Sequence, residues 1–137
     1  MAGMIGGIIV SHGKLAEELL NSLTIILGEV VNMEAISIGW YDDVDESKKK
    51  INQSLKRVDK KNGVVIFTDM FGGTPSNLSF SFMKDNKVEI ITGVNLPMLI
   101  KFVSLQRSSK FEEVARKVVE QGKKNIHLAS ALLSSKQ

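Results

Sequence analysis

Residues 64–75 read VVIFTDMFGGTP, and this stretch decides the fold class. Its first four residues are β-branched or aromatic and apolar, which is typical of a strand that is buried on both faces. Asp69 and a glycine pair follow, and then Thr74-Pro75, which predicts a helix with threonine as its N-cap and proline in its first turn. A strand that leads through a polar loop into a helix is the repeating unit of parallel α/β sheets.

The same unit recurs along the chain. Short apolar runs predict strands at residues 5–10, 33–38, 64–68 and 88–92, and a last short run at 126–129 predicts an edge strand. In the run at 33–38, apolar and polar residues alternate more than in the other runs, which is typical of an edge strand. Apolar residues at helical spacing predict helices after each strand, with helix ends at Gly28, at Asn62-Gly63 and at Gly122, and a capping box at Ser109–Glu112.

We therefore expect an α/β fold in one domain, residues 1–137, with a doubly wound, mostly parallel sheet and helices on both faces. The chain has 137 residues, of which 43% are hydrophobic and 24% charged, the balance of a globular protein. The net charge of +3 is too small and too scattered to favour nucleic-acid binding. The absence of cysteine excludes disulfides and thiolate metal sites.

The early apolar run at residues 4–10 is much shorter than the roughly 20 residues that a membrane span needs. No basic segment precedes it, so it does not resemble a signal peptide. We expect a cytoplasmic protein, and we expect neither a metal nor a cofactor.

Candidate catalytic residues follow two of the predicted strands. His12 lies between Ser11 and Gly13 after the first strand, and Asp69 follows the third. Ligands of doubly wound sheets bind beyond the carboxyl ends of the strands, so His12 and Asp69 converge if these two strands are neighbours. A neutral imidazole offers one nucleophilic nitrogen, and a carboxylate on the other nitrogen fixes the tautomer and stabilises developing positive charge.

The glycines beside these residues suggest an anion site. Gly72 and Gly73 allow the backbone to approach a ligand closely, and Thr74 adds a hydroxyl at a predicted helix start, which suits phosphate oxygens. By contrast, we interpret residues 40–43, Trp-Tyr-Asp-Asp, as a strand-to-helix loop with an acidic N-cap. Each of these features alone is weak, and their arrangement around two strand ends carries the hypothesis.

Three segments resemble signatures of the mannose-family IIA domains (EIIA) of the bacterial phosphoenolpyruvate-dependent sugar phosphotransferase system. Residues 11–13 look like the active-site histidine loop, residues 68–77 are similar to the second active-site loop, and residues 93–99 resemble the third signature. They occur in the order and spacing of the family, and the resemblance covers residues 4–129. The sequence departs from the family where Phe71 replaces a frequent tryptophan and where Thr74 replaces a frequent serine.

The resemblance implies a phosphotransferase with a phosphohistidine intermediate. His12 would accept a phosphoryl group on Nε2 from the phosphocarrier HPr, Asp69 would orient His12, and the phosphate would lie against Gly13, Phe71, Gly72, Gly73 and Thr74. An EIIB on a separate chain would receive the phosphoryl group and phosphorylate a sugar that enters through a membrane EIIC/EIID complex. The family also implies a homodimer in which the last strand, residues 126–129 here, pairs in the partner subunit.

The sequence alone leaves other functions open. An EIIA-like phosphocarrier of the dihydroxyacetone kinase system would share the fold and the histidine. A nucleotide- or flavin-binding module is disfavoured because the glycine motifs of such modules do not follow the first strand. A response-regulator receiver would carry acidic residues where Ser11-His12-Gly13 stands. A regulatory role that senses phosphorylation would use the same chemistry.

Overall fold

The computed structural model describes residues 3–70, 72–83 and 87–134. Its sheet is parallel and has the strand order β2-β1-β3-β4. The strands are β1 (Gly6–His12), β2 (Met33–Ile38), β3 (Val64–Thr68) and β4 (Val88–Thr92). β1 and β3 are neighbours, which is the condition for the convergence of His12 and Asp69, and the predicted edge position of β2 is confirmed.

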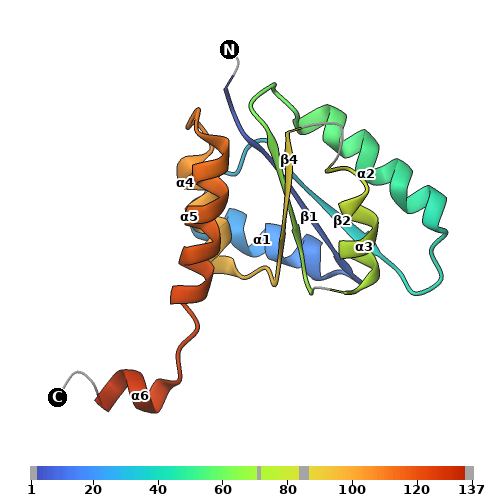
Figure 1. Ribbon diagram of the computed structural model, residues 1–137. Helices are drawn as coiled ribbons and strands as arrows, with labels where there is room; N and C mark the ends of the chain where they lie inside the picture. Colours follow the sequence, from blue (N-terminus) through green and yellow to red (C-terminus); the bar gives the residue numbers. More distant parts are fainter. Residues whose placement is uncertain (1–2, 71, 84–86, 135–137) are drawn as a thin grey trace.

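Helices cover both faces of this sheet (Figure 1). One face carries α1 (Leu15–Leu27), α4 (Leu96–Leu105) and α5 (Phe111–Lys124), and the other carries α2 (Val44–Val58) and α3 (Thr74–Phe80). A last helix, α6 (Ala129–Ser134), stands away from the sheet. The predicted α/β architecture is confirmed. Among the described residues, no helix is both long and apolar enough to cross a lipid bilayer.

The buried strands supply two separate cores, one on each face. In β3, Val65 and Phe67 pack with α1, α4 and α5, whereas Val64 and Ile66 pack with α2 and α3. Phe67 meets Phe102 of α4 edge to face, with ring centroids 5.2 Å apart. Successive side chains of a strand point to opposite faces, so a strand covered on both faces needs the unbroken apolar run that the sequence has here.

Two predicted helix boundaries are wrong, and each has a structural reason. The helix predicted to reach Lys61 ends at Val58, because the backbone of Asp59 is extended. Gly122 lies inside α5 rather than at its end, since a Cβ at Gly122 would come within 2.5 Å of Met98 Cε in α4. That glycine lets the two helices pack closely. The predicted capping box is not formed: Lys110 is the N-cap, and its side chain makes no capping hydrogen bond.

The edge strand predicted at residues 126–129 is not formed in the single chain. Residues 126–128 belong to no helix or strand, and Ala129 begins α6. This segment leaves the end of α5 and extends away from the sheet (Figure 1). Its backbone therefore has no strand of its own chain beside it with which to pair.

Candidate active site

His12 and Asp69 form one hydrogen-bonded unit at the carboxyl end of the sheet. The Nδ1 atom of His12 lies 2.8 Å from Oδ2 of Asp69, and the His12 backbone N–H donates to the same oxygen at 2.9 Å. The Met70 backbone N–H donates to Oδ1 at 3.0 Å. The convergence predicted from strand order is confirmed, because β1 and β3 are paired and end at the same edge. Three contacts therefore fix the carboxylate.

These contacts also favour the ionised form of Asp69. Burial acts to raise the pKa of this carboxyl, but the hydrogen bonds from the His12 backbone and ring, the charge of the ring and the Met70 N–H together hold the pKa below its ordinary value. An ionised carboxylate can only accept hydrogen bonds, so the proton between the two side chains belongs to Nδ1 of His12. In that tautomer Nε2 carries a free lone pair and can act as a nucleophile.

Gly73 lies directly against the outer edge of the imidazole. A Cβ at this position would come within 2.7 Å of His12 Cε1 and within 3.3 Å of Nε2. Such a distance is shorter than van der Waals contact, so only glycine allows the loop to approach the ring this closely. Gly72 and Gly13 have positive φ angles of 85° and 52°, a conformation that side-chain-bearing residues adopt at a cost.

Buried hydroxyls hold the loop that carries Asp69. The Ser76 hydroxyl donates to the carbonyl oxygen of Met70 at 2.6 Å, and it accepts from the Thr68 hydroxyl, also at 2.6 Å. On the other loop, the buried Ser11 Oγ accepts the Ala16 backbone N–H at 2.6 Å and so satisfies a donor in the first turn of α1. Ser76 had no assigned role from the sequence, although its place in the first turn of a helix after a strand was a usable signal.

A cavity of about 230 Å³ opens beside His12. Thr74 lines it from one side, and Trp40 and Asp42 of the β2–α2 loop line it from another. The interpretation of residues 40–43 as a strand-to-helix loop with an acidic N-cap is confirmed, since they join β2 to α2 and Asp43 is the N-cap of α2. The proximity of Trp40 to His12, however, was missed. The available signal was that Trp40 closely follows a strand predicted at the edge of the same sheet.

The remaining predicted site residues have mixed outcomes. Thr74 is the first residue of α3 rather than its N-cap. Gly73 is the N-cap instead, because its backbone is extended and its carbonyl accepts the Asn77 N–H at 3.0 Å. Phe71 lies outside the described residues. The assignment of Gly13, Phe71, Gly72, Gly73 and Thr74 to a phosphate stays a prediction.

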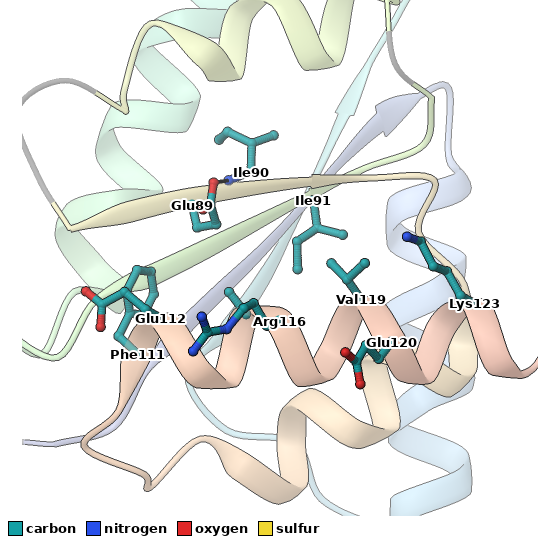
Figure 2. A pocket seen from close by; sticks show the side chains of 10 residues that line it. Glu89, Ile90, Ile91, Phe111, Glu112, Arg116, Val119, Glu120 and Lys123 are labelled. Carbon is teal, nitrogen blue, oxygen red and sulfur yellow. Dashed lines mark hydrogen bonds between the residues drawn. The ribbon is translucent and has the colours of Figure 1, made fainter.

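A second cavity, of about 550 Å³, lies between β4 and α5 and is larger than the one at His12. Figure 2 shows Ile91 and Val119 facing each other across it, with charged side chains such as Glu112 and Arg116 along the rim. Its lining contains no histidine, so we assign the chemistry to the smaller cavity, which His12 lines beside the Asp69 carboxylate. Within the described ranges, no three His, Asp or Glu side chains are grouped so that they could hold a metal ion.

Several known proteins match this chain over most of its length. Residues 6–119 match the family described as "PTS system fructose IIA component". The chain is 29% identical over 128 residues to the PTS system fructose-specific EIIA component of Bacillus subtilis (strain 168), covering 93% of this chain and 88% of that protein. It is 31% identical over 131 residues to the PTS system mannose-specific EIIAB component of Escherichia coli (strain K12), covering 90% of this chain and 39% of that protein. The crystal structure of phosphotransferase system component EIIA from Streptococcus agalactiae superimposes with a TM-score of 0.83 at 26% identity, covering 93% of this chain and 99% of that one.

The lowered pKa of Asp69 predicts how the pair responds to acid. The carboxyl should titrate below the ordinary aspartate value of about 3.9. Its contribution to stability is then present above the unfolded pKa and is lost as the pH falls through the folded one. The measurement is a carboxyl ¹³C NMR titration. In His12→Ala the ring contact is gone while the backbone contacts stay, so the pKa should rise toward the ordinary value. An Asp69 that titrates at or above about 3.9 in the unaltered protein would contradict this prediction.

Proposed function

This chain belongs to the mannose/fructose/sorbose family of EIIA components of the sugar phosphotransferase system, and we propose that His12 carries its phosphoryl group. The chain is thus a phosphocarrier with phosphotransferase activity. One observation carries the assignment to His12: its Nδ1 lies 2.8 Å from the Asp69 carboxylate, which leaves Nε2 free beside a cavity. The matches do not favour the dihydroxyacetone kinase system or a nucleotide- or flavin-binding module.

In the proposed reaction, phospho-HPr is the donor. The lone pair of His12 Nε2 attacks phosphorus, the new Nε2–P bond forms, and the nitrogen–phosphorus bond of the donor breaks. The donor nitrogen keeps the electron pair. The proton on Nδ1 stays in place, so the phosphorylated ring is positively charged, and the Asp69 carboxylate stabilises that charge at hydrogen-bond distance. The same steps in reverse deliver the phosphoryl group to an EIIB partner, and this exchange takes place in the cytoplasm.

The phosphoryl oxygens, in this proposal, lie against the two loops that flank Nε2. Gly73 supports this placement because it packs on the ring edge that holds Nε2, and Thr74, which carries a hydroxyl, lines the cavity beside His12. Gly13 follows His12, and nothing lies within 4 Å of the position that a Cβ at Gly13 would take, so there is open space beside this glycine. Gly72 and Phe71 complete the loop in the proposal. Peptide N–H groups in such loops bind anions well.

We further propose that the protein is a homodimer in which C-terminal segments are exchanged. β4 is an edge strand, and the larger cavity runs beside it along α5 (Figure 2). Residues 126–134 extend from their own domain with Ile126 and Leu128 about three-quarters exposed, at 75% and 74%. An exposed apolar segment is complementary to an open strand edge beside a cavity with an apolar floor at Ile91 and Val119, so the segment of one copy fits the edge of the other.

Substitution of the two paired residues should separate their functions. His12→Ala should abolish phosphoryl acceptance because the nucleophile is lost. Asp69→Asn should slow transfer about a hundredfold, because an amide neither fixes the tautomer nor stabilises the charged ring. The phosphorylation of both variants is measured as the increase in intact mass during incubation with phosphoenolpyruvate, enzyme I and HPr. Thermal unfolding serves as the control that each variant is folded. Transfer to Asp69→Asn at the unaltered rate would contradict the orienting role.

Gly73→Ala should slow transfer at least tenfold although the backbone at this residue, with φ −83°, accepts alanine. Its Cβ would come within 2.7 Å of His12 Cε1 and push the ring away from Asp69. Ser81→Ala serves as the control at the opposite end of α3, where the Ser81 hydroxyl donates to the carbonyl of Leu78. Equal transfer rates for Gly73→Ala and the unaltered protein would show that a Cβ fits beside the imidazole, and would contradict this prediction.

Replacement of Leu128 by aspartate should convert the dimer into a monomer, because a charge would then have to be buried against the apolar residues Ile91 and Val119 of the cavity. Ile25→Asp is the matched control: Ile25 is also large, apolar and exposed, and it lies on α1. Light scattering would give the molecular mass of the unaltered protein and of each variant. A monomeric unaltered protein, or a dimer that survives Leu128→Asp, would refute segment exchange.

A further inference from the structure

Trp40 stands beside the reactive imidazole. Its ring centroid lies 6.2 Å from that of His12, and the two ring planes are tilted by 42°. This distance is within the range of about 4.5–7 Å in which aromatic rings interact. Trp40 also lines the cavity that opens on His12. No part of the proposed transfer reaction uses this residue so far.

The fold determines the position of Trp40. β2 pairs with β1 so that Ile38 lies opposite His12, and Trp40 follows Ile38 after a single glycine. The turn is closed by the Asp42 side chain, whose Oδ2 accepts the Gly39 backbone N–H at 2.7 Å. Because β1 lies between β2 and β3, the indole approaches the ring from the β2 side while Asp69 approaches it from the β3 side.

Packing within the domain does not explain an indole at this place. The Trp40 side chain is 90% exposed, and that of its neighbour Tyr41 is fully exposed at 101%. Side chains this exposed contribute little to the free energy of folding through burial. Trp40 differs from Tyr41 in its contact with His12, since no ring contact of Tyr41 is found among the described residues. Replacement of either residue should therefore leave the domain folded.

We propose that Trp40 is a positioning residue for phosphoryl transfer, which holds the His12 imidazole from the side opposite Asp69 and stabilises its positive charge. The inference rests on the proposed function in one respect, namely that His12 is the phosphoryl acceptor. When Nε2 attacks phosphorus, the ring becomes cationic while Nδ1 keeps its proton. Tryptophan has the aromatic face that attracts cations most strongly. Asp69 and Trp40 then stabilise the same charge from two sides and limit rotation of the ring.

A small phosphoryl donor separates this effect from protein docking. Phosphoramidate transfers its phosphoryl group to the nucleophile as its own P–N bond breaks and ammonia leaves with the electron pair. Trp40→Ala should take up phosphate from phosphoramidate about three- to tenfold more slowly than the unaltered protein, measured by intact mass. Trp40→Phe should recover most of the rate because it keeps an aromatic face. Tyr41→Ala, the matched control, should react at the unaltered rate.

Trp40 is the single tryptophan of the chain, so its fluorescence reports on the contact directly. Phosphorylation of His12 should shift the emission of the unaltered protein, and His12→Ala treated with the same donor should show no shift. An emission unaffected by phosphorylation, or a Trp40→Ala rate equal to that of the unaltered protein, would overturn the proposal. So would a Trp40→Phe rate as low as that of Trp40→Ala.

The two donors also distinguish failure of this inference from failure of the proposed function. A Trp40→Ala that is slow with phospho-HPr but normal with phosphoramidate would make Trp40 a docking residue and overturn the positioning role. An unaltered protein that reacts with phosphoramidate but not with phospho-HPr would contradict the proposed function alone. An unaltered protein that takes phosphate from neither donor would overturn both.

Discussion

The parallel pairing of β1 with β3 creates the hydrogen bond between His12 and Asp69, on which the proposed chemistry depends. Val10 lies opposite Thr68, so the two strands end at the same edge, where His12, the last residue of β1, meets Asp69, which follows β3. Two residues 57 positions apart in sequence thereby become one unit. A slip of β1 by one residue would turn each of its side chains to the other face and break both the core and the pair.

The two hydrophobic cores keep that pairing in register. Ile8 and Val10 of β1 pack toward α2 and α3, while Ile9 packs toward α1, α4 and α5, so both faces of β1 oppose such a slip. At the end of β3, the Thr68 and Ser76 hydroxyls tie the Asp69 loop to α3. The site thus has rigid strand ends beneath it and short loops around it, which is the usual placement for catalytic groups in α/β sheets.

Hydrophobic periodicity predicted the four strands of the sheet, and the geometry of parallel sheets predicted that His12 and Asp69 meet if the first and third strands are neighbours. Sequence patterns failed where the role of a residue is determined by a contact with a residue far away in the sequence. Gly122 ends no helix, since its lack of a side chain serves contact with Met98. The strand expected at 126–129 is not formed, because this segment extends away from the sheet and lies beside no strand of its own chain. Trp40 acquires its place beside His12 through the register between β2 and β1, which no local pattern encodes.

The most direct test of the account asks which nitrogen of His12 becomes phosphorylated. Protein labelled with ¹⁵N-histidine would be phosphorylated through phospho-HPr, and the ring nitrogens would be observed by NMR. Because Asp69 holds Nδ1 at 2.8 Å, the account predicts phosphorus on Nε2 and a proton retained on Nδ1. Phosphorus on Nδ1 of His12, or on a residue other than His12, would contradict it.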